Sequence, residues 1–329
     1  MNIHSLRRVR TALAASLAVC ASLAWSPAQS QAYPVKPVRF IVPYTPGGVA
    51  DLSARFIGNK LSETWSQQVL VDNRPGGNTI IGSEALVKSL PDGYTLFLTT
   101  IAHTIIPSLM PTPYDAVKDF AAVATIASNE IVLVATPGLP AKSLKELIAQ
   151  AKTKPGQINY GSAGTGTINH LAGELFAVAA GVRLQHISYK GIQPAMADVI
   201  SGRVELSFAS PIYVFPLLAG GKIKALGISG ARRLPTLPDV PTFTEGGLTG
   251  MDAKNWVGIA APAGTPRPVI DRISGDVARI LGQRDVSEFL VKQGLDPFIS
   301  TPDQAAALIR NDIARFAAII KSANIKIEN

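Results

Sequence analysis

The sequence predicts an α/β protein built from two lobes. Short apolar runs alternate with stretches whose apolar residues recur at helical spacing, a pattern typical of βαβ units with parallel sheets. About 300 residues follow an N-terminal processing signal, a length that is large for one core and suits two lobes. No repeat of fixed period and no low-complexity segment is evident in the sequence.

The first 32 residues have the features of a secretion signal. A basic start with three arginines precedes an apolar run over residues 11–25, and a small-x-small cleavage site ends at Ala32. The apolar run is short for a membrane span. We therefore expect cleavage after Ala32 and a periplasmic protein. Lipoprotein acylation at Cys20 is the alternative, although Val19 is bulkier than the residue that usually precedes such a cysteine.

Composition excludes several classes of function. Cleavage would remove the only cysteine, so the mature chain would have no thiol chemistry and no disulfide. Because the signal holds three arginines and no acidic residue, cleavage lowers the net charge from +8 to +5. This charge is spread along the chain, which suits a small anion better than nucleic acid. The mature histidines lack metal-site spacing, so we expect no metal and no cofactor.

The periodicity predicts nine strands and nine helices after the signal. The expected strands are Val38–Val42, Gln68–Val71, Tyr94–Thr99, Glu130–Ala135, Ile158–Gly161, Gln185–Tyr189, Leu206–Ala209, Lys224–Ile228 and Trp256–Ala261. The expected helices are Val49–Thr64, Thr79–Ser89, Leu144–Lys152, Thr167–Ala180, Gln193–Ser201, Val214–Ala219, Pro268–Leu281, Val286–Gln293 and Pro302–Ser322. Proline and glycine mark the joints between them.

Two crossings are expected to divide the chain, near Glu130–Thr136 and Asn255–Pro262. The first lobe would comprise residues 33–133 together with a return segment and C-terminal helices over 254–329. Residues 134–253 would form the second lobe. A pair of crossings of this kind can act as a hinge between lobes.

The most informative segment is NYGSAGTGTINHLAGELF, residues 159–176, where a loop of glycines and hydroxyl side chains precedes a well-patterned helix. Such a loop presents unpaired backbone N–H groups at the positive end of the helix, where an anion is favoured. The segment matches neither the dinucleotide fingerprint, nor a P-loop, nor a nucleophile elbow. The alternative to an anion site is a flexible linker, which the tightly joined helix disfavours.

A second loop of this kind is PYTPGGVADLSARF, residues 43–56, directly after the first expected strand. Gly47 and Gly48 allow the backbone to approach a ligand closely, and Thr45 offers a hydroxyl group. Asp51 would complement the helix dipole and brace the loop. Alone, the segment could be an ordinary βα turn. Two such loops in separate halves of the chain predict a carboxylate held between two lobes.

Other polar residues have two interpretations. Lys190 would place a positive charge near the carboxylate, or would simply face solvent. His103 follows a strand and could line the cleft, but a lone histidine is more often structural, and His170 is expected to order its loop. A hydrolase could be assembled on paper from Ser162, His103 and Asp51, although no sequence signature supports such a triad.

Seven segments, all in one order, carry a family resemblance over almost the whole mature chain: PVKPVRFIVPYTPGG (34–48), VDNRPGGNTIIGSEAL (71–86), PDGYTLFL (91–98), INYGSAGTGTINHLAGELF (158–176), ISYKGIQPAMADVISGRVELSF (187–208), LPDVPTFTEGG (237–247) and WVGIAAPAGTP (256–266). The chain resembles the Bug-type extracytoplasmic solute receptors, the binding components of tripartite tricarboxylate transporters. Asn78-Thr79 and Ile105-Ile106 depart from the family pattern where ligand choice could be set, whereas Glu205 replaces an aspartate and keeps the charge.

The resemblance implies a type II periplasmic-binding-protein fold, in which two α/β lobes joined by a two-crossing hinge close over a ligand. It implies a di- or tricarboxylate, an acidic amino acid or an aromatic acid held by backbone amides, hydroxyls and water, and delivery to permease subunits. A monomer is expected. The candidate ligand-binding residues are Tyr44, Thr45, Gly47, Gly48, Thr100, His103, Gly161, Ser162, Ala163, Gly164, Thr165, Thr167, Lys190 and Ser210.

The leading interpretation is therefore a non-enzymatic receptor that shifts toward a closed form when a carboxylate touches both lobes. One alternative is a sensor subunit that reports the ligand to a membrane kinase. The other is a periplasmic serine hydrolase that uses Ser162. The sequence alone does not separate transport from sensing, and it does not name the carboxylate.

Overall fold

The computed structural model describes residues 33–251, 253–322 and 325. The expected secretion signal, its cleavage site after Ala32 and Cys20 lie outside the described residues. The described residues from Lys36 onward form one compact unit, and every described helix and strand belongs to it. Within the described residues, no helix has both the length and the apolar character needed to cross a membrane.

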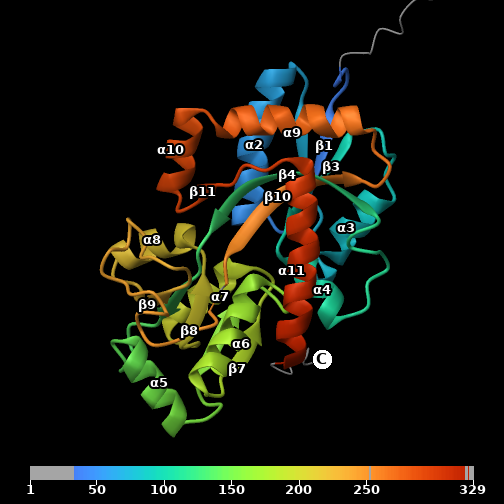
Figure 1. Ribbon diagram of the computed structural model, residues 1–329. Helices are drawn as coiled ribbons and strands as arrows, with labels where there is room; N and C mark the ends of the chain where they lie inside the picture. The colour runs from blue at the N-terminus through green and yellow to red at the C-terminus, as the bar shows by residue number, and fades with distance from the viewer. Residues whose placement is uncertain (1–32, 252, 323–324, 326–329) are drawn as a thin grey trace, which may run out of the picture. The chain divides into compact units, whose positions relative to one another are not determined.

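One sheet has six strands in the spatial order β11-β4-β10-β3-β1-β2 (Figure 1). Its strands are β1 (Val38–Val42), β2 (Val69–Asn73), β3 (Thr95–Thr100), β4 (Phe120–Asn129), β10 (Asn255–Pro262) and β11 (Asp296–Pro297). β1 pairs in parallel with β2 and β3, whereas β10 runs antiparallel to β3 and β4.

The other sheet has five strands in the order β7-β6-β8-β5-β9. Its strands are β5 (Val132–Ala135), β6 (Asn159–Ser162), β7 (Gln185–Ser188), β8 (Leu206–Ala209) and β9 (Lys224–Ile228). β6 pairs in parallel with β7 and β8, and β5 runs antiparallel to β8 and β9. The expectation of parallel sheets is thus wrong at β5, β10 and β11, which each run antiparallel to their neighbours. β5 and β10 are the first strands that the chain forms after it passes from one sheet to the other. Each therefore starts at the end of its sheet that is nearer the other sheet, and runs in the direction opposite to its neighbours.

The helices begin and end close to the expected residues. They are α2 (Val49–Trp65), η1 (Gly77–Thr79), α3 (Ile80–Val87), α4 (Ala102–Leu109), α5 (Leu144–Thr153), α6 (Ile168–Ala180), α7 (Ile192–Ser201), α8 (Pro211–Ala219), α9 (Arg267–Leu281), α10 (Arg284–Lys292) and α11 (Pro302–Ser322). Local chemistry sets several ends. The Thr167 side chain caps α6, a proline starts α8, and left-handed glycines end α6 and α7. The strands β4 and β11 and the helix α4 were not predicted.

The chain passes between the sheets twice. β4 ends at Asn129 in the six-stranded sheet and β5 begins at Val132 in the five-stranded one, so residues 130–131 make the first passage. The return lies between Ile228 and Asn255. Asn129 and Asn255 are paired neighbours across β4 and β10, which brings the two passages together. The expected boundaries at 133/134 and 253/254 concern which residues move as a body, and they stay a prediction.

A single apolar cluster contains residues from elements of both sheets. It includes Phe208 of β8 and Phe176 of α6, together with Trp256 of β10 and Phe316 of α11. Figure 1 shows α11 running lengthwise beside α4 toward the C-terminus, and the two helices are in contact. The two sheets therefore share part of their hydrophobic core, and α11 contributes to it.

Candidate functional site

Five helices begin beside a cavity between the two sheets. α2, α4, α6, α7 and α8 directly follow β1, β3, β6, β7 and β8, so each starts at the carboxyl end of a strand. The first N–H groups of a helix have no intrahelical partner, and the helix dipole is positive at that end. The arrangement is electrostatically suited to an anion. The cavity is lined by Tyr44, Thr45, Gly48, Val49, Ala50, Thr100, Ile101, Ala102, Ala163, Thr167, Ile168, Asn169, Gly191, Ile192, Gln193, Ser210, Tyr213, Asn255 and Val257.

This inner cavity has a volume of about 90 Å³ and adjoins an outer cavity of about 600 Å³. The two share lining residues, among them Tyr44, Thr45 and Thr167. The outer cavity adds residues 75–79, the loop 164–166 and Lys190. Among the described residues that line either cavity, Lys190 alone carries a full charge, and none is acidic. The polar groups that line the inner cavity are therefore backbone dipoles and neutral side chains, set among apolar residues.

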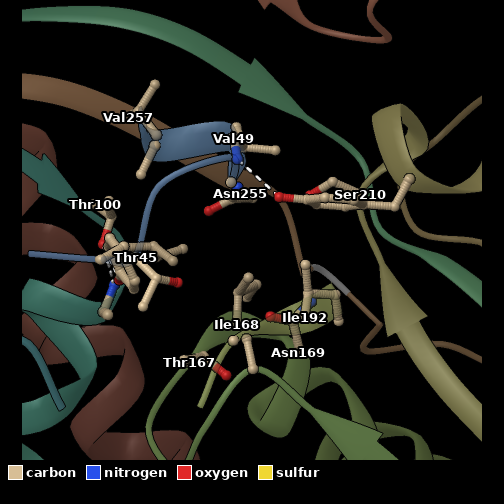
Figure 2. A pocket seen from close by; sticks show the side chains of 18 of the residues that line it. Thr45, Val49, Thr100, Thr167, Ile168, Asn169, Ile192, Ser210, Asn255 and Val257 are labelled. Carbon is tan, nitrogen blue, oxygen red and sulfur yellow. Dashed lines mark hydrogen bonds between the residues drawn. The ribbon is translucent and has the colours of Figure 1, made fainter. Parts of the chain in front are cut away.

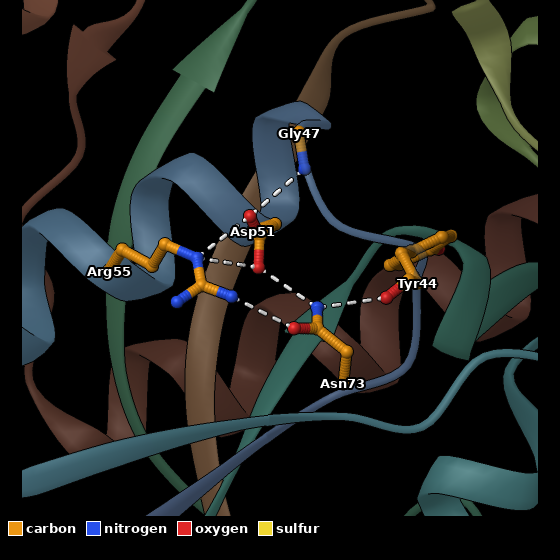
Figure 3. A network of polar contacts seen from close by, with 5 residues as sticks. All are labelled: Tyr44, Gly47, Asp51, Arg55 and Asn73. Atoms are coloured by element: carbon orange, nitrogen blue, oxygen red, sulfur yellow. Dashed lines mark hydrogen bonds and ion pairs between the residues drawn. The ribbon is translucent and has the colours of Figure 1, made fainter.

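Asp51 holds in place the loop that precedes α2, residues 43–48, which we call the first loop (Figure 3). Its carboxylate accepts from the Gly47 N–H at 3.0 Å, from Arg55 Nε at 3.0 Å and from Asn73 Nδ2 at 2.9 Å, and Asn73 Nδ2 also donates to the Tyr44 carbonyl at 3.0 Å. Burial alone would raise the pKa of Asp51, but these donors outweigh it and lower the pKa. The network fixes the loop and pairs the Gly47 N–H with Asp51, and Gly47 does not line either cavity.

The loop that precedes α6, residues 162–167, which we call the second loop, is held by a buried serine and two histidines. Ser162 is fully buried, and its Oγ lies 2.7 Å from His186 Nε2 and accepts from the Gly164 N–H at 3.1 Å. The Gly166 N–H donates to His170 Nδ1 at 3.3 Å, as expected for a histidine that orders the loop. The centroids of the two histidine rings are 4.2 Å apart. Ser162 therefore shapes the loop from beneath and does not face the cavity.

Both histidines are held in the neutral form. Burial lowers the pKa of His170 to about 3, helped by the neighbouring His186, and burial lowers the pKa of His186 to about 4. A neutral pair can accept from the Gly166 amide and bond the Ser162 hydroxyl without adding charge beneath the loop. The backbone N–H groups of Gly164 and Gly166 are thereby held from beneath the loop by a neutral support.

His103 lies away from both cavities. It is 2% exposed, and its Nε2 is 2.8 Å from the carbonyl of Ala116. Its ring meets the ring of Phe120 edge-on, with centroids 4.4 Å apart, and burial lowers its pKa to about 4. The neighbouring Thr100 does line the inner cavity, where its Oγ1 is 2.9 Å from the Tyr44 hydroxyl. His103 is thus a core residue, whereas Thr100 forms part of the wall of the inner cavity, where a cavity-lining residue was expected.

A hydrogen bond joins elements of the two sheets across the inner cavity. The N–H of Val49, the first residue of α2, donates to the hydroxyl of Tyr213 on α8 at 2.8 Å. Figure 2 shows this bond as the dashed line at the Val49 nitrogen. Burial raises the pKa of Tyr213 to about 12, so the phenol keeps its proton at neutral pH. Its O–H remains a donor beside the start of α2.

Most candidate residues come together. The cavities are lined by Tyr44, Thr45, Gly48, Thr100, Ala163, Gly164, Thr165, Thr167, Lys190 and Ser210, but not by Gly47, His103, Gly161 or Ser162. Gly161 instead allows close packing, because a Cβ there would meet Ala195 at 3.2 Å. Sequence reasoning missed the lining residues Asn169, Gln193, Tyr213 and Asn255. A polar residue in the first turn of an apolar helix was the available signal for Asn169.

The hydrolase alternative gains no support from this geometry. Ser162 is bonded to His186 rather than His103, and its hydroxyl is buried. Asp51 is occupied by Arg55 and the first loop. The described residues also contain no group of three or more histidine, cysteine, aspartate or glutamate side chains placed to hold a metal ion.

Comparison with known proteins gives consistent matches. The tripartite tricarboxylate transporter family receptor matches residues 53–325. BugT of Bordetella pertussis is 34% identical over 92% of this chain and 94% of its own. Rpa4515 of R. palustris, solved with adipate, has a TM-score of 0.86 at 33% identity, covering 89% of this chain and 99% of its own. MatC from Rhodopseudomonas palustris, solved with malate, has a TM-score of 0.82 at 29% identity, covering 88% and 100%.

These matches confirm the two-lobe, type II periplasmic-binding-protein fold that the resemblance implied. The matched family consists of receptors that bind a solute, so the interpretation as a non-enzymatic protein is confirmed as well. Both conclusions agree with a cavity rich in backbone dipoles and with a buried Ser162. The chain belongs to the tripartite tricarboxylate transporter family of receptors.

Proposed function

We propose that this protein is a periplasmic receptor that captures a small organic carboxylate between its lobes and delivers it to a tripartite tricarboxylate-type permease. The observation that supports it best is the convergence of five helix N-termini on a cavity with no acidic lining residue. The structural relatives solved with adipate and malate each hold a carboxylate. Lys190 in the outer cavity adds one positive charge for an extended or second acid group.

Closure of the lobes is the proposed binding mechanism. The moving bodies are residues 33–133 with 254–329, and residues 134–253. Each contributes helix N-termini to the inner cavity, so a ligand gains its full set of donors only when the lobes are closed. A ligand with that differential affinity shifts the population toward the closed form. The Val49–Tyr213 bond belongs to this closed arrangement.

The energy of such a site is sufficient without an arginine clamp. A hydrogen bond to a charged group contributes about 1.5–3 kcal/mol. A dissociation constant of 1 μM corresponds to about 8 kcal/mol at 25 °C. A few amide and hydroxyl bonds to a carboxylate, less the cost of ordering the two lobes, supply an affinity in this range.

A ligand screen tests the carboxylate assignment. The mature protein, beginning at Tyr33, is heated with a library of carboxylates and with the matching primary amides, which share size but carry no charge. A ligand at a hundredfold excess over its dissociation constant adds about 2.7 kcal/mol of stability. We expect at least one acid to raise the melting temperature while its amide does not. The proposal fails if no acid does so, or if amides match their acids.

The role in transport has its own test. A strain lacking the gene should lose uptake of the identified acid and regain it with the intact gene. Retained uptake, together with a lost transcriptional response to the acid, would identify a sensor instead. Mass measurement of the exported protein tests cleavage after Ala32, and light scattering tests whether it is a monomer.

A further inference from the structure

We propose that the captured solute is a hydroxycarboxylate, whose hydroxyl group donates to the side-chain amide oxygen of Asn169 or of Asn255 in the inner cavity. This inference rests on the proposed function and names the class of acid. Both asparagines line the inner cavity and are more than nine-tenths buried, with exposures of 8% and 9%. Figure 2 shows the two side chains on different sides of that cavity.

A chain of hydrogen bonds fixes the orientation of Asn255. The Nδ2 of Asn129 donates to the carbonyl oxygen of Glu130 at 2.7 Å, and a carbonyl can only accept. Asn129 must therefore present its Oδ1 to Asn255, whose Nδ2 donates to it at 3.1 Å. Rotating either amide would set two donors or two acceptors against each other. The Oδ1 of Asn255 is thus left for the cavity.

Asn169 is fixed more directly. Its Nδ2 donates to the carbonyl oxygen of Phe208 at 2.5 Å, which leaves its Oδ1 as the free end of the amide. Neither Oδ1 atom has a hydrogen-bond partner among residues 33–251, 253–322 and 325. The cavity consequently presents two atoms, each on a buried residue, that can accept hydrogen bonds and cannot donate them.

An amide oxygen of this kind cannot bond to a carboxylate, since both groups only accept. An acceptor left unpaired when a ligand fills the cavity costs free energy, so the preferred ligand brings a donor of its own. Analogues that lack the donor are rejected because the polar groups of the site stay unpaired. One hydroxyl serves one of the two oxygens, and a second hydroxyl or a water serves the other.

The donor is a hydroxyl rather than an ammonium group. None of the described residues that line either cavity is acidic, and the helix N-termini around the inner cavity are positive. The nearby Asp51 is already paired with Arg55. A buried cation would therefore lack a counter-charge, and burying an unpaired charge is costly. A neutral hydroxyl donates without that cost.

Matched acids test the proposal by calorimetry. The series compares succinate with malate and tartrate, glutarate with 2-hydroxyglutarate, and benzoate with the hydroxybenzoates. Aspartate and oxaloacetate report an amine and a ketone on the succinate skeleton. We expect a hydroxy acid to bind about tenfold tighter than its parent, as one net hydrogen bond implies, with no such gain for amine or ketone. Parents that bind as tightly as their hydroxy acids in every pair would overturn the hydroxyl assignment while leaving the carboxylate receptor intact. If no acid binds, the proposed function itself fails.

Variants assign the effect to the two oxygens. Asn169→Ala and Asn255→Ala are compared with a control, Asn311→Ala. The control removes an exposed side-chain amide on α11, from a residue that lines neither cavity. The readout is the ratio of affinities for a hydroxy acid and its parent, because a general loss of stability lowers both affinities together. We expect the ratio to fall toward 1 in at least one of the two cavity variants and to persist in Asn311→Ala. A ratio unchanged in both cavity variants would overturn the inference.

Discussion

At the scale of single residues, the hydroxyl of Tyr213 occupies the position that an anion would seek at the start of α2. It accepts the Val49 N–H at 2.8 Å and keeps its own proton for donation. Because the N–H at the start of α2 polarises the phenol, its O–H can therefore donate a hydrogen bond to a ligand. It does so only while α8 and α2 are held together.

Tyr213→Phe is expected to weaken ligand binding by about three- to tenfold, because one net hydrogen bond of the closed form, about 0.5–1.5 kcal/mol, is lost. Isothermal titration with the ligand found in the screen measures the change. Tyr94→Phe is the matched control, since the Lys36 ammonium lies over that ring and does not need the hydroxyl. Equal affinities for the wild type and Tyr213→Phe would contradict a role in closure.

Gly166 is a second residue on which we expect closure to depend. Its φ is +80°, and an added Cβ would clash with Cδ1 of Ile106 on α4. Gly166 follows β6 of the five-stranded sheet, whereas α4 follows β3 of the six-stranded sheet, so the clash would push the two lobes apart. Gly166→Ala should lower ligand affinity at least about tenfold, and its left-handed backbone should cost roughly 1–2 kcal/mol of stability. Adding Ile106→Ala removes the clash but not the backbone cost. The double variant should therefore regain affinity without regaining stability, as titration and urea unfolding would show.

At the scale of elements, the polar network behind α2 is the main support of the first loop. Asp51 is 2% exposed and accepts from a backbone amide, an arginine and an asparagine. Asp51→Asn would turn an amide group toward those donors. We expect a loss of about 1.5–3 kcal/mol in the free energy of unfolding, the usual worth of bonds to a charged group. Asp271→Asn is the control: its partner Arg267 is exposed, so its change should stay within about 1 kcal/mol.

The buried histidines predict how stability depends on pH. The pKa of His103 is lowered to about 4, so between that value and its ordinary pKa of about 6.5 the unfolded chain binds more protons than the folded one. Stability is therefore present at neutral pH and lost as pH falls. On the order of 1 kcal/mol should be lost at this residue between pH 6.5 and 5. The carboxylates, with unfolded pKa values near 4, act mainly below that window.

Urea unfolding at pH 6.5 and 5 checks this expectation. His103→Gln keeps a donor for the Ala116 carbonyl but does not titrate, so the loss between the two pH values should shrink by about 1 kcal/mol. His170 and His186 titrate in the same direction, and the remaining slope should come largely from them. An unchanged difference in His103→Gln would show that this histidine is protonated to the same degree in both states.

Sequence reasoning located elements whose signals are local. β1, β8, β9 and α11 begin and end at the predicted residues, since each is an apolar or amphipathic run with clear punctuation. β4 was missed because its alanines and small polar residues have weak strand preference and depend on pairing with β10. α4 was missed because β-branched residues and Pro107 disfavour a helix there, and packing against α11 decides the matter.

The same distinction applies to the site. That both glycine-containing loops line the cavities could be predicted, because glycines and hydroxyl residues before a helix have a local meaning. The inward turn of Ser162 depends on His186, which lies on the next strand. Tyr213 and Asn255 reach the cavity only through the folded chain, and the orientation of Asn255 depends on a carbonyl two hydrogen bonds away. Such relations have no sequence pattern at fixed spacing.

At the scale of the whole molecule, the proposed hinge predicts lobes that move relative to each other in the absence of ligand. Small-angle scattering should show a smaller radius of gyration when the ligand of the screen is added, because closure brings the two bodies together. Gly166→Ala should stay near the unliganded value at the same ligand concentration. A radius that does not change in the wild type would argue for a preformed site and against closure by population shift.

The apolar cluster shared by the two sheets also bears on biogenesis. Phe316 and Ile320 of α11 are buried in it beside residues that were synthesised more than a hundred positions earlier. A chain that ends before Pro302 lacks α11, so the apolar side chains that this helix covers are exposed to solvent. Such a chain is prone to aggregation and proteolysis. Premature stop codons near the 3′ end of the gene should therefore be nearly as damaging as early ones, even though they spare every cavity-lining residue.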